Sequence, residues 1–119
     1  MDKVIVIALL IAVVIYFQYK ESDFVPVTPL FTESYVVVYG REACGNTKYM
    51  ESALTNADVS FYFGDFDDPK VKKEIYDRMD MAGYDTDDNF ILPVVDVNGV
   101  IMVNPNIEVI LAKYRMEKQ

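Results

Sequence analysis

A strand–helix–strand pattern between residues 34 and 63 constrains the fold of this chain more than any other feature. Residues 34–40 carry a β-branched and aromatic run, and residues 59–63 carry a second apolar run. Between them, residues 44–57 place apolar side chains at the i, i+3, i+4, i+7 spacing of an amphipathic helix. A helix that connects two strands of one sheet makes those strands parallel. We therefore expect an α/β fold.

The rest of the chain predicts a second helix, two more strands and a last helix. The Asp68-Pro69 pair is typical of a helix start, because aspartate is a favoured N-cap and proline is favoured at the first helical position. Gly83 can end that helix. An acidic loop follows over residues 84–90. Two strands are expected over residues 91–97 and 100–103, and a final helix from residue 107 onward.

The two last strands are joined by Asn98-Gly99, which is a strong signal for a type I′ hairpin turn. The hairpin adds an antiparallel pair to the parallel pair of the first two strands. The predicted order is β-α-β-α-β-β-α. We expect one mixed four-stranded sheet with helices on its faces.

Residues 4–17 form an unbroken apolar run flanked by Lys3 and Lys20. Fourteen helical residues span about 21 Å, whereas the hydrocarbon core of a bilayer is about 30 Å thick. Lysine side chains that reach the interface bring residues 3–20 close to a full span, so we predict a single-pass membrane anchor there. A signal peptide is the alternative, but no small-x-small cleavage site follows the run. The flanking lysines do not decide on which side of the membrane the rest of the chain lies.

Residues 21–33 include Pro26 and Pro29, which favour an extended juxtamembrane linker. The domain itself is expected over residues 34–119. The chain has 11 basic and 19 acidic residues, a formal net charge of -8, and no basic cluster. This charge balance argues against nucleic acid as a partner. The chain also has no histidine, which excludes histidine-based acid–base catalysis and most transition-metal sites.

Cys44 is the only cysteine, and it lies at the start of the helix predicted over 44–57. Unpaired N–H groups and the positive end of the helix dipole favour the thiolate there, which is the reactive form. We therefore interpret Cys44 as a nucleophile; an inert packed cysteine is the alternative. With a single cysteine, the chain cannot form an internal disulfide.

The segment Cys44-Gly45-Asn46-Thr47, the proline near the start of the third strand, the Asn-Gly hairpin and the last helix resemble the glutaredoxin branch of the thioredoxin fold. The resemblance covers residues 34–119. It implies that Cys44 is the catalytic nucleophile and that Thr47, whose hydroxyl can donate to the thiolate, stands where dithiol enzymes have their second cysteine. An external thiol would then have to release the bound product. Gly45 would let a substrate backbone approach closely.

The resemblance also implies a glutathione site. Pro93 occupies the position of the family's cis-proline, and Leu92 would pair its backbone with the bound peptide. Arg41 would lower the pKa of the thiol and meet a glutathione carboxylate. The family's Gly-Gly pair is replaced by the Asn104-Pro105-Asn106 segment, in which Asn106 could still cap the last helix and expose N–H groups to a carboxylate. Simpler interpretations remain open: a turn proline for Pro93, a solvated charge for Arg41 and a first-turn polar residue for Thr47.

The expected function is that of a membrane-anchored thiol–disulfide oxidoreductase. It would act on mixed disulfides between proteins and glutathione, with glutathione as co-substrate and no tightly bound cofactor. Arg41 and Lys48 would supply the positive charge near the site. Two alternatives are an iron–sulfur scaffold formed by two subunits with glutathione, and a non-catalytic adaptor. A calcium loop over 85–96 is rejected, and no metal ligands are predicted, because Phe90 replaces the glycine that such a loop requires.

Overall fold

The computed structural model describes residues 25–87 and 89–117. The predicted anchor and the first four residues of the predicted linker lie outside this range. No helix within it has the length and apolar character needed to cross a membrane. The described elements follow the predicted order and are β1 (Val36–Gly40), α2 (Gly45–Asn56), β2 (Tyr62–Asp65), α3 (Pro69–Met81), β3 (Val94–Val97), β4 (Val100–Val103) and α4 (Ile107–Glu117).

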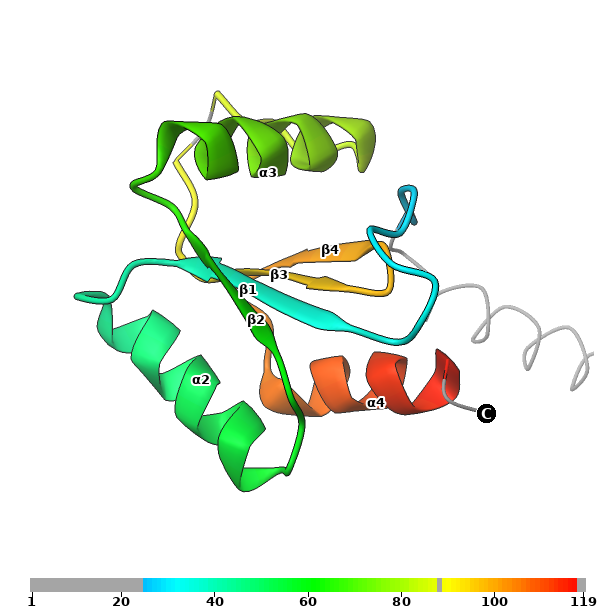
Figure 1. The fold of residues 1–119 in the computed structure, drawn as a ribbon. Coiled ribbons are helices and arrows are strands. Elements are labelled where there is room, and N and C mark those ends of the chain that lie inside the picture. Colours follow the sequence, from blue (N-terminus) through cyan, green and yellow to red (C-terminus); the bar gives the residue numbers. More distant parts are fainter. Residues whose placement is uncertain (1–24, 88, 118–119) are drawn as a thin grey trace, which may run out of the picture.

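The four strands form one mixed sheet in the order β2-β1-β3-β4 (Figure 1). β1 runs parallel to β2, with Val37 opposite Tyr62. β1 is antiparallel to β3, and β3 is antiparallel to β4. This confirms the predicted α/β class and mixed sheet, and the arrangement is compatible with a thioredoxin-like fold.

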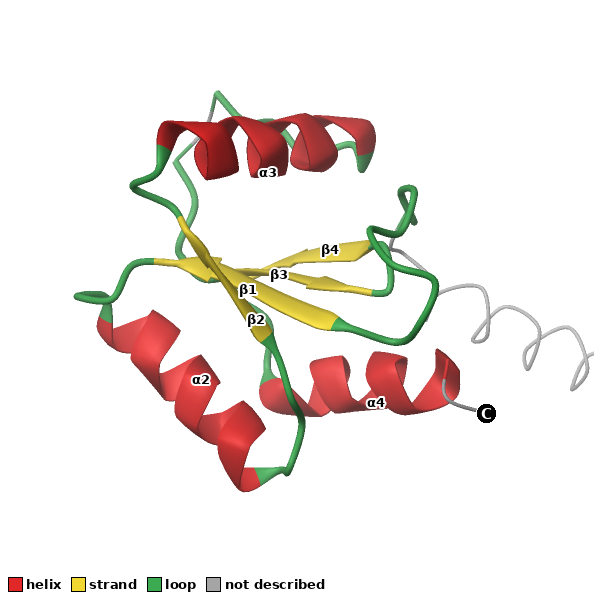
Figure 2. Cartoon of the chain, viewed as in Figure 1, coloured by secondary structure: helices red, strands yellow, loops and turns green. Residues whose placement is uncertain are grey.

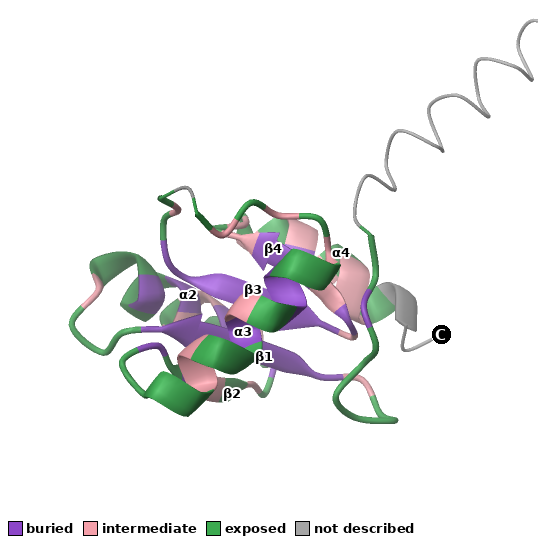
Figure 3. Cartoon of the chain, turned by 90° about the horizontal axis from the view of Figure 1, so that it is seen from above, coloured by how far each residue is buried: buried purple, intermediate pink, exposed green. Residues whose placement is uncertain are grey.

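Helices cover both faces of the sheet (Figure 2): α3 lies on one face, and α2 and α4 lie on the other. Side chains of β1 alternate between the two layers, as the pleat of a strand requires. Val37 and Tyr39 join the core under α3, whereas Val36 and Val38 join the core under α2 and α4. All five residues of β1 are buried, which explains the continuous apolar run of its sequence (Figure 3).

The predicted ends of two strands differ from the structure. The second strand was predicted over 59–63 but begins at Tyr62, because Val59 still belongs to the end of α2. Its N–H donates to the Leu54 carbonyl at 2.9 Å, after Asp58 has turned the chain with a φ of 59°. The third strand was predicted from 91 but begins at Val94, one residue after a proline that has no N–H to donate.

The predicted caps and turns are confirmed. The Asp68 carboxylate accepts a hydrogen bond from the Lys70 N–H at 2.9 Å at the start of α3, and Gly83 follows its end with a φ of 92°. Asn98 and Gly99 have φ values of 56° and 94°, as a type I′ turn requires at both central positions.

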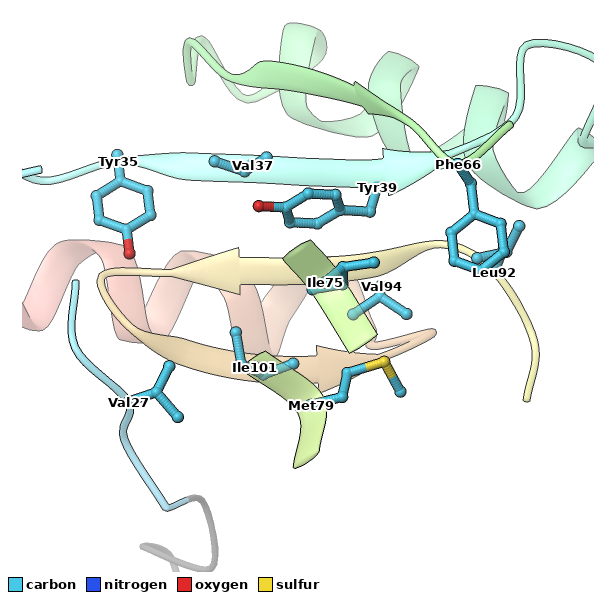
Figure 4. Packing of buried hydrophobic residues seen from close by; sticks show 10 residues of the cluster. All are labelled: Val27, Tyr35, Val37, Tyr39, Phe66, Ile75, Met79, Leu92, Val94 and Ile101. Atoms are coloured by element: carbon cyan, nitrogen blue, oxygen red, sulfur yellow. The ribbon is translucent and has the colours of Figure 1, made fainter. Parts of the chain in front are cut away.

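The second half of the predicted linker packs against the domain, and we call residues 25–33 the strap. The Val27 side chain is buried beside Ile101 (Figure 4), and its N–H donates to the Gly99 carbonyl at 2.7 Å. Arg78 Nη1 donates to the Thr28 carbonyl at 2.9 Å. The prolines that favour an extended path are present, but the strap belongs to the folded unit because the end of the sheet offers it partners.

A buried ion pair lies beneath the strap. Arg78 Nη2 is 2.6 Å from Asp96 Oδ2, and both side chains are almost fully buried. The Tyr35 hydroxyl and the Gly99 N–H also donate to the Asp96 carboxylate, at 3.1 and 2.9 Å. Burial raises the pKa of Asp96, and the charge of Arg78 and these hydrogen bonds offset only part of that effect. The cluster joins β1, α3 and the β3–β4 hairpin.

Candidate functional site

Cys44 is the N-cap residue of α2, as the sequence predicts. Its N–H donates to the Arg41 carbonyl at 2.9 Å, and its carbonyl accepts from the Lys48 N–H at 3.1 Å. The side chain is half-buried and packs against the core cluster that contains Leu92. The sulfur therefore lies at a fixed position where the helix begins, with part of its surface open to solvent.

The surroundings of Cys44 favour its thiolate. The Thr47 hydroxyl has the largest effect in lowering the pKa of Cys44, followed by the Thr47 N–H. The Asn46 N–H and the charge of Arg41 lower it further, and partial burial opposes them. The net direction is downward, so more of this thiol is ionised at neutral pH than of an ordinary cysteine.

Thr47 is fully buried under the end of β1. Its hydroxyl oxygen accepts a hydrogen bond from the Arg41 N–H at 3.4 Å, which leaves the hydroxyl hydrogen for the sulfur. Gly40 makes room for this arrangement, because a Cβ at that residue would lie 2.6 Å from Thr47 Cγ2. A glycine at the end of β1 thus permits the hydroxyl to reach Cys44.

Gly45 is the first residue of α2, and a Cβ placed on it would meet no protein atom within 4 Å. The space beside the cysteine is therefore open on this side. The role predicted for Gly45, to let a substrate approach, would use this open space.

The Leu92–Pro93 peptide bond is cis. The Leu92 side chain is buried, and within residues 25–87 and 89–117 its N–H and carbonyl make no hydrogen bond. Pro93 accepts a hydrogen bond from the Asn104 N–H at 2.7 Å, which fixes the segment against the loop after β4. Leu92 therefore brings to this cluster, which Cys44 also contacts, a backbone N–H and carbonyl that bond to no other described residue.

Arg41 and Leu92 line one pocket of about 320 Å³, which we call the cationic pocket. Arg41 is held by Asp67, with Nε 2.9 Å from Oδ1, and its guanidinium lies 5.3 Å from the centroid of the Phe66 ring. This position explains why its charge has only a small effect on the thiol. The remaining lining residues are Phe66, Lys72, Tyr76, Thr86, Asp87, Asn89 and Phe90.

The sequence did not single out Lys72 as part of the site. Its Nζ lies 5.3 Å from the Phe66 ring centroid and 5.9 Å from that of Tyr76. Lys48, which was expected to supply the second cation, instead pairs with Glu42 at 3.2 Å and lines a different hollow along α2. The sequence shows that Lys72 lies in the first turn after the Asp68-Pro69 start, but not that this turn reaches the pocket of Arg41 and Leu92.

Asn106 lines a second pocket of about 530 Å³, the amide pocket, between the beginnings of α2 and α4. Its carbonyl accepts from the Val109 N–H at 3.2 Å, as expected of the residue before a helix. The other lining residues are Asn46, Tyr49, Met50, Asn104, Pro105, Ile107 and Glu108. The structure thus places Asn106 with Asn46, two residues after the cysteine, and places Arg41 with Leu92 in the other pocket.

No model of a known protein family matches this chain, and no curated protein matches it significantly.

Proposed function

We propose that this chain is a membrane-anchored, glutaredoxin-like thiol–disulfide oxidoreductase that acts on glutathione mixed disulfides. The observation that carries the proposal is the environment of Cys44. Its pKa is lowered by the Thr47 hydroxyl and by N–H groups of α2, and it packs against the core cluster that also contains Leu92, the residue before a cis-proline. A nucleophile that shares its cluster with a backbone donor and acceptor bonded to no other described residue suits a peptide-like disulfide.

In the proposed reaction, the Cys44 thiolate attacks the glutathione sulfur of a protein–glutathione disulfide. The protein thiolate leaves and takes up a proton, and Cys44 becomes joined to glutathione. A second glutathione thiolate then attacks the glutathione sulfur of this adduct, which produces glutathione disulfide and restores the Cys44 thiolate. The external thiol is needed because the chain has one cysteine.

The two pockets support a ligand with a carboxylate near each end, as glutathione has. The cationic pocket offers Arg41 and Lys72 to one carboxylate. The amide pocket offers the beginning of α4 and the Asn106 side chain to the other. Leu92 would hold the backbone between them.

The anchor proposed over residues 3–20 would keep this activity at a membrane. It is supported by the length and the flanks of the apolar run in the sequence. The proposed protein partners are thiol or disulfide proteins, and glutathione is a co-substrate rather than a resident cofactor.

The proposal is tested with the full-length chain and a glutathionylated peptide, in the presence of glutathione and glutathione reductase. We expect Cys44→Ser to abolish turnover, and mass spectrometry of the wild type to detect glutathione on Cys44 after brief reaction without free glutathione. The Ser34→Cys/Cys44→Ser variant keeps one cysteine at another half-buried position and should be inactive. Turnover by Cys44→Ser would contradict the proposal.

A further inference from the structure

Most of the exposed large hydrophobic residues of the described region belong to the strap, the beginning of β2 and the end of α3. Seven large hydrophobic residues are exposed among residues 25–87 and 89–117. Two of them lie toward the pockets: Tyr49 lines the amide pocket, and Ile91 precedes Leu92 of the cationic pocket. The other five we call the end patch: Val25, Leu30, Phe31, Tyr62 and Met81.

Contacts fasten the strap part of the end patch to the sheet. The Phe31 ring stacks on Tyr62 at the beginning of β2, with 5.2 Å between the ring centroids. The Leu30 N–H donates to the Tyr35 hydroxyl at 3.0 Å. Met81 is the last residue of α3, one turn beyond Arg78, which binds the strap. In Figure 1 the strap, the β3–β4 turn and the end of α3 lie at the same end of the molecule.

The same end of the molecule is where the chain leads to the apolar run. That run ends at residue 17, and seven residues separate it from Val25. Seven extended residues reach at most about 25 Å. Because the strap is fastened to the sheet, Val25, the first described residue, is held at the end of the molecule that carries the end patch. If the run lies in a bilayer, the patch is held within reach of its surface.

We propose that the end patch rests on the lipid interface of the membrane. The inference depends on the proposed anchor, and it adds a second, peripheral contact that orients the domain. Tyrosine and phenylalanine are favoured at the interface, where an aromatic ring meets both acyl chains and headgroups. The hollow beside Phe31 and Tyr62 carries Glu33 and no basic side chain, so the patch suits zwitterionic rather than anionic headgroups.

This orientation of the domain restricts the side from which a substrate can reach Cys44. Val27 and Tyr35 lie at one end of the core, and Phe66 and Leu92 lie at the other (Figure 4). With the end patch on the lipid, Cys44 and both pockets face away from the bilayer. The substrate class is then a disulfide presented from the aqueous phase, not one at the membrane surface.

The chain has no tryptophan, so a single introduced indole reports its own surroundings. Full-length Tyr62→Trp is placed in phosphatidylcholine nanodiscs at one chain per disc, with or without lipids brominated near the headgroup. Tyr49→Trp is the matched control, because Tyr49 is 70% exposed and lies on α2 beside the amide pocket. Phe31→Trp is the second probe if Tyr62→Trp fails to fold.

We expect bromine to quench most of the fluorescence of Tyr62→Trp and to leave that of Tyr49→Trp unchanged. Equal quenching of the two variants overturns the inference. So does a Tyr62→Trp indole that is shielded from aqueous acrylamide but not quenched by bromine, since protein would then cover the patch. Flotation of the chain with vesicles tests the anchor separately from the end-patch contact. If the chain floats but its indole is not quenched, only the end-patch contact is contradicted. If the chain does not float, the anchor is contradicted as well.

Discussion

At the scale of single residues, the reactivity proposed for Cys44 depends on one hydroxyl. Thr47 is fully buried, its hydroxyl oxygen accepts from the Arg41 N–H, and the same hydroxyl has the largest effect in lowering the pKa of Cys44. The charge of Arg41 contributes less because Asp67 holds it. The neighbouring hydroxyl therefore lowers the pKa of the thiol more than the nearby cation does.

We predict that Thr47→Val raises the pKa of Cys44, because valine fills the same space without the hydroxyl. The thiolate exists above the pKa, so the rate should fall severalfold at mildly acidic pH and recover as the pH rises. The recovery is helped by the greater nucleophilicity of a more basic thiolate. The measurement is the rate of Cys44 alkylation at a series of pH values, followed by the absorbance of the thiolate or by mass spectrometry.

The matched control for this prediction is Thr47→Ser, which keeps the hydroxyl and should keep the pH profile near that of the wild type. An unchanged inflection in Thr47→Val would show that the helix N–H groups suffice without the hydroxyl.

At the scale of elements, α3 connects the core to the cationic pocket. Its buried face carries Ile75 and Met79 into the core, while its first turn carries Lys72 to the pocket. The Asp68 cap fixes where that turn begins. The position of the cation thus follows from the start of the helix.

We predict that Lys72→Met raises KM for a glutathionylated substrate about fivefold, which corresponds to the loss of about 1 kcal/mol of ion pairing, and leaves kcat nearly unchanged. Methionine keeps the apolar stem over Phe66. Steady-state kinetics at constant ionic strength provide the measurement.

Lys73→Met makes the same change of charge one residue away. Lys73 pairs with Asp77 outside the pocket, and its side chain is 78% exposed, so KM should stay within error of the wild type. Equal effects of the two variants would mean that the net charge of the domain, not the pocket, attracts the substrate.

The elements also show what the sequence could predict. Periodicity, the Asp68-Pro69 start and the Asn98-Gly99 turn identified every described element because each signal is local. The start of β2 was misplaced because Val59 looks like a strand residue, yet its N–H completes the end of α2. Lys72 was missed for another reason: only the packing of α3 on the sheet brings it to the pocket of Arg41 and Leu92.

At the scale of the whole molecule, the Arg78–Asp96 pair joins the strap to the sheet. Because burial raises the pKa of Asp96, the folded state binds a proton more tightly than the unfolded chain. The stabilisation that Asp96 contributes is therefore present at pH values below its pKa in the unfolded chain. It is lost as the pH rises through the higher pKa that Asp96 has in the folded state. Arg78 limits this loss because its positive charge stabilises the ionised carboxylate of Asp96.

We predict that Arg78→Met lowers the free energy of unfolding by about 3–5 kcal/mol at neutral pH, because it leaves the Asp96 charge buried without its partner. The penalty should shrink as the pH falls, since protonation removes that charge. Urea unfolding followed by circular dichroism at several pH values measures it.

Arg78→Met/Asp96→Asn is the control, since the amide is neutral at every pH. It should unfold with much weaker pH dependence than the single variant. A penalty of Arg78→Met that stays constant with pH would contradict the prediction and point to lost packing alone.

The strap has a consequence for the order in which the chain can fold during synthesis. The Thr28 carbonyl can accept its hydrogen bond only after Arg78, 50 residues further along, has been synthesised. The Tyr35 N–H likewise needs the side chain of Asn98, 63 residues further along. A ribosome releases these partners long after it has released the strap. The strap therefore emerges among the first described residues and is fixed among the last, so Val27 must remain unburied until the β3–β4 turn has been made.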